Sequence, residues 1–406
     1  MMEKLGIYVQ VPFCQTKCTY CNFHTGVVAS SRFAPYVEAV CREIREHREL
    51  LKAVGVDWHG RLGRSGAVPQ GRNGEIAGED LVVDTVYIGG GTPSLLDPAN
   101  LQNILDAIRS TFTAELAEVT LEADPETIEA KKAAAWVRAA INRVSFGLQS
   151  FSDKELVAAG RMHRRADIFR AVPILREAGI RNISFDLIAG LPHQSKESWR
   201  QSLDELGTLA PEHVSVYLLE IDEESRLGKE LLQGGGKYSA GAVPSEDEMV
   251  DYYEMAQKGL RAAGYHHYEI SNWAKPGFES RHNLKYWRRE AYLGFGAGAH
   301  SFSGTERWAN AHDAADYVTA LEGGRLPVEQ RETLTAESAL EEELFLGLRQ
   351  LDGIDVAQIE REYGVTVMGR FDPLTSAGLV ERDGSVVRLA PRRLSVSNEV
   401  FVELMR

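Results

Sequence analysis

One stretch, YVQVPFCQTKCTYCNF at residues 8–23, carries the most specific pattern in this chain. An apolar run at residues 5–11 has the composition of a β-strand, and the loop after it spaces Cys14, Cys18 and Cys21 as C-x3-C-x2-C. Three thiolates in one loop can hold three irons of a 4Fe–4S cube and leave the fourth iron open to a small chelating ligand. The stretch therefore predicts an iron–sulfur cluster directly behind the first strand.

The small ligand expected at the open iron is S-adenosylmethionine. A structural zinc site formed by the three cysteines and His24 is the main alternative, although such sites usually pair two separate hooks. Disulfides are less favoured, because the chain has only 4 cysteines in 406 residues and three of them are crowded together. The fourth, Cys41, shares a predicted helical face with apolar residues, which indicates a packed core thiol.

Composition limits the remaining function classes. With 44% hydrophobic residues the chain can build a large core, and its formal charge of −14 makes nucleic acid a poor default partner. No apolar run reaches the roughly 20 residues that a membrane-spanning helix needs. The start, MMEKLGIYVQ, is unlike a signal peptide. We therefore expect a cytoplasmic protein, with a peripheral membrane encounter left open.

Short apolar strands alternate with amphipathic segments over the first half of the chain. Such alternation predicts a parallel sheet with right-handed crossovers, here an α/β fold in the form of an open, partial (β/α)6 barrel spanning residues 1–222. Residues 58–80, rich in Gly and Arg, are expected to form a mobile surface insertion. The predicted strands are Leu5–Val11, Leu81–Ile88, Glu118–Glu122, Arg143–Phe146, Asn182–Ile188 and His213–Leu219.

Two further units are expected after the barrel. Residues 223–330 have longer, less regular segments and form an accessory α+β unit. Residues 331–406 contain helices followed by a strand pair around an Asp-Gly turn, a pattern typical of a winged-helix-like domain. Because of the acidic charge, protein contact or a structural lid is favoured over nucleic acid for this domain.

Polar residues follow several of the predicted strands, where ligands collect in parallel barrels. The triple glycine around Gly90 lets backbone approach a ligand, and Glu122 could accept from ribose hydroxyls. Arg161 suits a carboxylate, although a surface ion pair is the ordinary alternative. Asp186 lies inside an apolar strand, so its acid needs a partner, and Gln149 ends another strand.

These motifs, taken in order, resemble radical S-adenosylmethionine enzymes of the oxygen-independent coproporphyrinogen III oxidase superfamily. The resemblance rests on the cysteine loop, GGGTPS, the Asp124-Pro125 segment, RVSFGLQSF, GRMH and FDLIAGLP. It implies a radical SAM barrel. It also implies that S-adenosylmethionine contacts Tyr8, Gly90, Thr92, Glu122, Gln149, Arg161 and Asp186. Gln10 departs from the pattern, because these proteins usually have His there.

The second half of the chain extends the resemblance. The run HNLKYW at residues 282–287, the segment YLGFGAGAHSF and the ending LSVSNEVF are similar to the radical SAM haem chaperones, the HemW family. This family implies haem binding and delivery to haem-dependent acceptors such as respiratory cytochromes. His282 is then the favoured haem contact and Tyr286 a weaker one. Three other histidines remain competing ligands, namely His266, His267 and His300.

The alternative function is that of the oxygen-independent coproporphyrinogen III oxidases, which decarboxylate porphyrinogen propionates. Those oxidases share a long extension before the cluster and an additional Cys just after its third Cys. Here the cysteines begin at Cys14, and Asn22 and Phe23 follow the third. The sequence therefore favours the haem carrier, while the motifs do not decide whether S-adenosylmethionine is cleaved.

Overall fold

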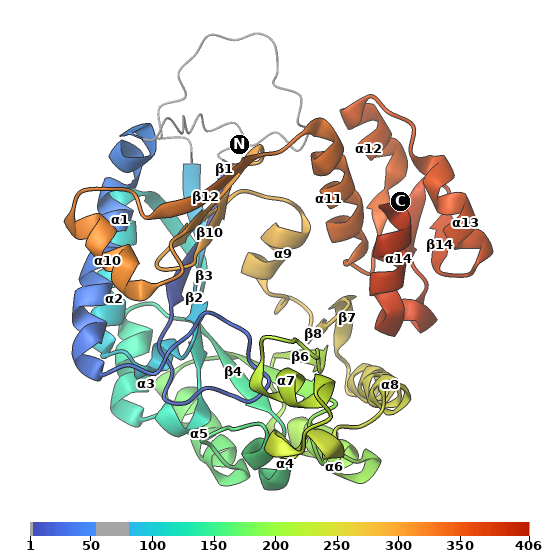
Figure 1. Cartoon of the computed structure of the whole chain (residues 1–406), viewed down its shortest axis with the longest axis horizontal. Helices are drawn as coiled ribbons and strands as arrows, with labels where there is room; N and C mark the ends of the chain where they lie inside the picture. The colour runs from blue at the N-terminus through green and yellow to red at the C-terminus, as the bar shows by residue number, and fades with distance from the viewer. Residues whose placement is uncertain (1–2, 54–80, 406) are drawn as a thin grey trace.

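The computed structural model describes residues 3–53 and 81–405. The predicted mobile insertion at 58–80 lies outside the described residues. Six strands pair side by side in chain order and in parallel, which confirms the predicted partial (β/α)6 barrel (Figure 1). They are β1 (Glu3–Val11), β2 (Leu81–Gly90), β3 (Thr113–Ala123), β4 (Arg143–Gln149), β5 (Asn182–Ala189) and β6 (His213–Leu218).

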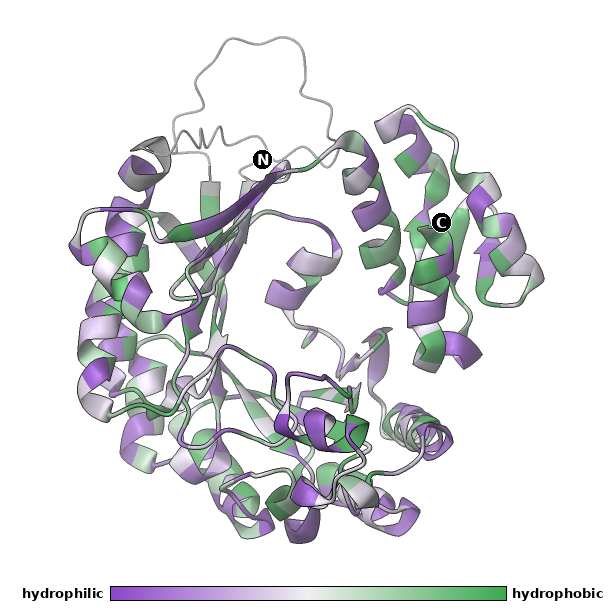
Figure 2. Ribbon diagram, viewed as in Figure 1, coloured by the Kyte–Doolittle hydropathy of each residue, from purple (hydrophilic) through white to green (hydrophobic). Residues whose placement is uncertain are grey.

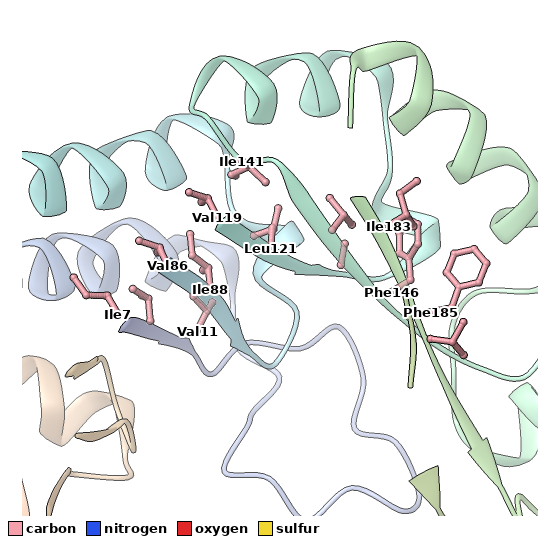
Figure 3. Packing of buried hydrophobic residues seen from close by; sticks show 14 of the residues in the cluster. Ile7, Val11, Val86, Ile88, Val119, Leu121, Ile141, Phe146, Ile183 and Phe185 are labelled. Atoms are coloured by element: carbon pink, nitrogen blue, oxygen red, sulfur yellow. The ribbon is translucent and has the colours of Figure 1, made fainter. Parts of the chain in front are cut away.

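Helices cover the outer face of this sheet. Alternate strand residues project outward and pack between strands and helices as one apolar core, to which Ile7, Ile88 and Phe146 belong (Figure 3). Trp136 and Trp199 extend this core from the helices and are fully buried. The covering helices are α1 (Phe33–Ala53), α2 (Pro98–Thr111), α3 (Ala130–Arg138), α4 (Asp153–Ala158), α5 (Arg165–Ala178) and α6 (Lys196–Leu209).

The inner face of the same strands is polar. Because side chains alternate along a strand, the residues between the core positions all point into the barrel. They include Tyr87, Glu122, Arg143, Asp186 and His213, which line an internal cavity. The strands are thus apolar toward the helices and polar toward the barrel axis, so the barrel interior is built to meet a polar ligand.

Segments from the expected accessory unit continue the sheet at both edges. β8 (Asn272–Ala274) and β7 (His266–Glu269) follow β6, and β9 (Tyr292–Phe295) pairs in parallel with β1. Residues 223–330 therefore add to the barrel sheet, and the domain bounds taken from the sequence stay a prediction. This region also contains β10 (His300–Phe302), β11 (Glu306–Asn310), β12 (Val328–Thr333), α7 (Arg226–Leu232), α8 (Glu246–Ala262), α9 (Arg281–Trp287) and α10 (Ala314–Glu322).

The C-terminal unit has the predicted winged-helix-like order. Its three short strands form a separate sheet, and Gly384 provides the left-handed backbone (φ +61°) of the tight turn between the last two. Figure 2 shows hydrophobic residues gathered between its helices and sheet. The elements are α11 (Ala336–Leu348), β13 (Ile354–Asp355), α12 (Val356–Tyr363), α13 (Phe371–Ser376), β14 (Val380–Asp383), β15 (Val386–Leu389) and α14 (Ser397–Leu404).

None of the helices within residues 3–53 and 81–405 is both long and apolar enough to cross a bilayer.

Candidate functional site

A cavity of about 560 Å³ occupies the barrel and opens where the strands end. The structure brings the three cysteines and six of the seven predicted S-adenosylmethionine residues into its wall. They are Cys14, Cys18, Cys21, Gly90, Thr92, Glu122, Gln149, Arg161 and Asp186. The cysteines predicted from their spacing and the residues predicted from the strand ends therefore line the same cavity.

Backbone hydrogen bonds hold the cysteine loop at its base and in its middle. The Cys14 amide donates to Gly26 O (3.0 Å), and the Thr19 amide donates to Ala159 O (3.0 Å). Gly91 passes so close that a Cβ there would lie 2.5 Å from Phe13 O and 3.0 Å from the Cys14 Sγ. Only glycine fits at this position without a shift of the loop.

The thiols are free and suit a cluster. Burial raises the pKa of both Cys14 and Cys21 above the usual value, so metal binding would have to drive their deprotonation. Within the described residues no three His, Cys, Asp or Glu side chains converge on a single ion site. A cube presents a separate iron to each cysteine, so its ligands need not converge. His24, the fourth ligand of the zinc alternative, instead lies against the ring of His312, 4.2 Å between centroids.

Glu122 meets the glycine turn at the end of β2. Its carboxylate accepts from the Gly90 amide (2.9 Å) and the Tyr87 hydroxyl (2.9 Å). Burial raises the pKa of Glu122 to about 7. Gly90 has φ +114°, and a Cβ there would lie 2.6 Å from the Gln10 amide. The positive φ favours glycine at this turn, and Gln10 occupies the position where the resembling enzymes have His.

Arg161 has a carboxylate partner from the chain itself. It forms a short ion pair with Asp124, and it also donates to Gly147 O (2.9 Å) and approaches the Cys18 Sγ at 3.3 Å. Thr92 Oγ1 donates to the second oxygen of Asp124 (3.2 Å). Asp124 therefore links two predicted ligand contacts to the cysteine loop. Sequence reasoning quoted the Asp124-Pro125 segment but gave Asp124 no role.

Two further predicted contacts face the cavity. Gln149 adopts a left-handed conformation (φ 60°), and its Oε1 is buried without a hydrogen-bond partner among the residues the structure describes. Asp186 accepts from Ser145 Oγ (3.2 Å), and burial raises its pKa. Tyr8 does not line the cavity, but it stacks on the lining residue Tyr87 (6.0 Å). An orphaned acceptor and a protonatable acid are groups that a polar ligand could satisfy.

His282 is held inside the protein by α9. Glu118 on β3 accepts the amide of His282 (3.0 Å), and the imidazole is fully buried. Its Nδ1 lies 2.9 Å from Thr85 Oγ1 and its Nε2 lies 2.8 Å from the Tyr286 hydroxyl. Burial lowers the pKa of His282 to about 3, so the ring is neutral and uses both nitrogens in hydrogen bonds.

The predicted haem contacts do not face the barrel cavity. His282 lines neither cavity described here, whereas Tyr286 and His300 line a second one of about 280 Å³. The remaining histidines lie elsewhere: His267 stacks on Trp273 (4.0 Å), and His266 lies 3.9 Å from Glu279. The haem role of His282 and Tyr286 stays a prediction.

Sequence reasoning missed two parts of the wall of the barrel cavity. One is its floor, formed by Arg143 and His213, and the other is its lid, formed by Leu394 and Asn398. Arg143 is 1% exposed and faces the cavity, and its Nε has no partner within the described parts of the chain. His213 lies nearby on β6. Leu394 and Asn398, from the C-terminal unit, also line the cavity. The only signal for these residues was their place in quoted motifs, RVSFGLQSF for Arg143 and LSVSNEVF for the lid.

Comparisons with known proteins agree with this geometry. The radical SAM superfamily matches residues 8–206, and the HemN C-terminal domain matches residues 334–392. Among solved structures, the coproporphyrinogen III oxidase HemN of Escherichia coli has a TM-score of 0.80 at 21% identity. It covers 99% of this chain, which covers 90% of it. At that identity the likeness shows the fold.

Several curated relatives match most of the length of the chain. The "Heme chaperone HemW" of Bacillus subtilis is 33% identical, with 97% of both chains covered. The protein of the same name from Mycobacterium tuberculosis is 32% identical over 99% of this chain and 95% of its own. That of Escherichia coli is 35% identical over 74% of this chain and 70% of its own. With this identity over nearly its full length, the chain belongs to the HemW family of radical SAM heme chaperones.

Proposed function

We propose that this protein binds haem and transfers it to haem-dependent acceptor proteins. The observation that carries the proposal is the match to curated heme chaperones along nearly the whole chain, including the region of α9 and the C-terminal unit. Respiratory cytochromes are the acceptors we expect. A cytoplasmic location and a peripheral membrane encounter, both expected from the sequence, stay part of the proposal.

Two cofactors belong to the barrel in this proposal. Cys14, Cys18 and Cys21 would hold a 4Fe–4S cluster, which supplies an electron to S-adenosylmethionine when both are bound. Six of the predicted contacts that line the cavity would hold S-adenosylmethionine, with Tyr8 stacked on the neighbouring Tyr87. They are Gly90, Thr92, Glu122, Gln149, Arg161 and Asp186.

His282 and Tyr286, the residues to which the sequence assigns a haem role, enter the proposal as one hydrogen-bonded unit. Their spacing of four residues places both side chains on one face of α9, and the 2.8 Å contact joins them. A substitution at either residue is therefore expected to change the position of the other side chain.

A second candidate function is oxidative decarboxylation of coproporphyrinogen III. The observation that favours it is the buried Arg143 guanidinium on the cavity floor, which could receive a substrate carboxylate below the S-adenosylmethionine residues. The overall fold of HemN is compatible with this reaction but does not select it.

One experiment separates the two functions. Cluster-reconstituted protein is titrated anaerobically with hemin and followed by its Soret band, and a parallel sample is given coproporphyrinogen III with S-adenosylmethionine and a reductant. Saturation near one haem per chain without porphyrinogen turnover supports the carrier. Turnover without saturable haem binding would replace it by the oxidase.

A further inference from the structure

The second cavity lies apart from the barrel cavity and shares no lining residue with it. It is enclosed by α9, strands β9 to β11 and α11, and α9 stands between the barrel sheet and α11 (Figure 1). We call it the aromatic hollow. Its wall consists of Tyr286, Trp287, Tyr292, Phe302, Phe345 and Leu346, with the polar side chains His300, Arg289, Arg307 and Glu342.

The rings of the aromatic hollow are arranged around a shared space. Tyr286 and Tyr292 meet edge to face with centroids 4.7 Å apart, and Tyr292 lies 6.2 Å from Phe302. The guanidinium groups of Arg289 and Arg307 stand 5.2 and 5.4 Å from the centre of the Phe302 ring. A wall of aromatic rings beside cations suits a flat, polarisable ligand that carries negative charge.

His300 offers an imidazole to this space. Residues alternate along β10, so His300 and Phe302 share one face, while Ser301 on the other face accepts from the Gly294 amide (2.8 Å). Neither imidazole nitrogen of His300 has a hydrogen-bond partner in the described part of the chain, in contrast to His282. Burial, with help from His312 and Arg307, lowers the pKa of His300, so the neutral imidazole has a lone pair available.

Two buried donors in the hollow also lack acceptors. Arg289 is bound by Glu342 through its Nε (3.1 Å), but its Nη2 is buried with no partner among the described residues. The same holds for the indole N–H of Trp287. Arg307 donates to the other oxygen of Glu342 (2.8 Å). Glu343 lies 3.5 Å from the Arg289 Nη1, so two carboxylates meet the two arginines. A ligand with carboxylates is therefore favoured by the two buried donors that lack acceptors in the described chain, the Arg289 Nη2 and the Trp287 indole N–H.

Tyr286 connects the hollow to the interior of the barrel. Its hydroxyl lies on the Nε2 of His282, whose Nδ1 is in turn fixed by Thr85, while its ring faces Tyr292. His282 can therefore set the position of one wall of the hollow without reaching into it. The hydroxyl of Tyr286 contacts His282, and its ring contacts Tyr292.

Resting on the haem-carrier function proposed above, we propose that haem binds in the aromatic hollow, with His300 as iron ligand, Tyr286 and Phe302 along the macrocycle and Arg289 toward a propionate. His282 is a positioning residue that holds Tyr286. The hollow of about 280 Å³ has room for roughly nine water molecules. That is less than a whole tetrapyrrole needs, so one edge of the macrocycle stays in solvent, where an acceptor can reach it.

The test uses the full-length, cluster-reconstituted protein titrated anaerobically with hemin. His300→Ala should raise the Kd at least tenfold and remove the spectral signature of imidazole ligation, and added free imidazole should restore that signature. His282→Asn should keep the imidazole signature while binding more weakly. His266→Ala is the matched control, because it removes a histidine outside the hollow, and it should bind haem as the wild type does.

Folding is monitored separately by S-adenosylmethionine binding, which none of these variants should change because the two cavities share no residue. If His300→Ala keeps the wild-type Kd and ligand signature, or if His282→Asn alone loses the signature, the placement is overturned while the carrier function stands. If the wild-type protein itself shows no saturable haem binding, the carrier function fails and the placement fails with it.

Discussion

Gly91 is the position where a single methyl group should damage the cysteine loop. In the Gly91→Ala variant the new Cβ would lie 2.5 Å from Phe13 O, so this contact must open by at least 0.5 Å to reach the 3.0 Å limit. The backbone segments at Gly91 and Phe13 cannot separate easily, because two hydrogen bonds join them. The Gly91 amide donates to Val11 O (2.8 Å), and the Thr92 amide donates to Phe13 O (2.7 Å). Overpacking of this kind costs about 1–3 kcal/mol, and the rigid setting favours the upper half.

The same displacement moves the loop that carries Cys14, whose Sγ would lie 3.0 Å from the new methyl group. We expect Gly91→Ala to unfold roughly 2–4 °C below wild type, because unfolding entropy grows with chain length. We also expect it to retain less iron and sulfide per chain after anaerobic reconstitution. Gly26→Ala, at the other end of the loop, is the control, because a Cβ there meets nothing within 4 Å. Equal melting temperatures and equal iron content in Gly91→Ala and wild type would refute the steric reasoning.

Three further predictions concern buried charge and packing. Burial raises the pKa of Glu43 from 4.5 to about 7. Between about pH 4.5 and 7 the folded chain therefore keeps a proton on Glu43 that the unfolded chain releases. The free energy of unfolding should fall by ~3 kcal/mol as the pH rises through this range. Urea unfolding across that range should show a smaller slope in Glu43→Gln; an identical slope would exclude Glu43 as its source. Asp124→Asn leaves the Arg161 guanidinium without its carboxylate and should lower the free energy of unfolding in urea by about 3–5 kcal/mol. Equilibrium dialysis should show at least tenfold weaker S-adenosylmethionine binding. A loss of stability below about 1 kcal/mol would contradict a strong buried ion pair. Leu394→Ala removes a buried side chain from the lid and should destabilise by roughly 2–5 kcal/mol in chemical unfolding, whereas a neutral result would mean that the lid is loosely packed.

The barrel could be predicted because its strands are short, apolar and regularly spaced, and because parallel strands bring their carboxyl ends together. Cys14, Glu122 and Asp186 lie on different segments, yet they share a cavity. Cys14 follows a strand, Glu122 lies near the end of one, and Asp186 points inward from the middle of another. The strand bounds were shorter than observed for β3, whose first residues, from Thr113, are partly exposed and lack an apolar pattern.

The parts that the sequence could not supply depend on pairing between distant segments. The partner of Arg161 is Asp124, 37 residues away, and no local pattern predicts that contact. The motif HNLKYW does not indicate which of its side chains line a cavity. In the structure His282 is fully buried, whereas Tyr286 and Trp287 line the aromatic hollow. A helix of this length fits either arrangement, so the sequence alone cannot choose between them. The extension of the sheet by β9 was equally hidden, because a four-residue strand carries little periodic signal.

The central position of β1 in the sheet affects how the chain can fold during synthesis. β1 pairs with β2 on one side and with β9, at residues 292–295, on the other. At ribosomal rates of about 5–20 residues per second, roughly 15–60 seconds pass between the emergence of the first strand and the emergence of β9. Throughout that interval one edge of β1 has no strand to pair with, next to a loop of three reduced thiols. A nascent chain of this protein is therefore exposed to aggregation and to oxidation at the same place, and a folding helper or early metal loading at that edge would protect both.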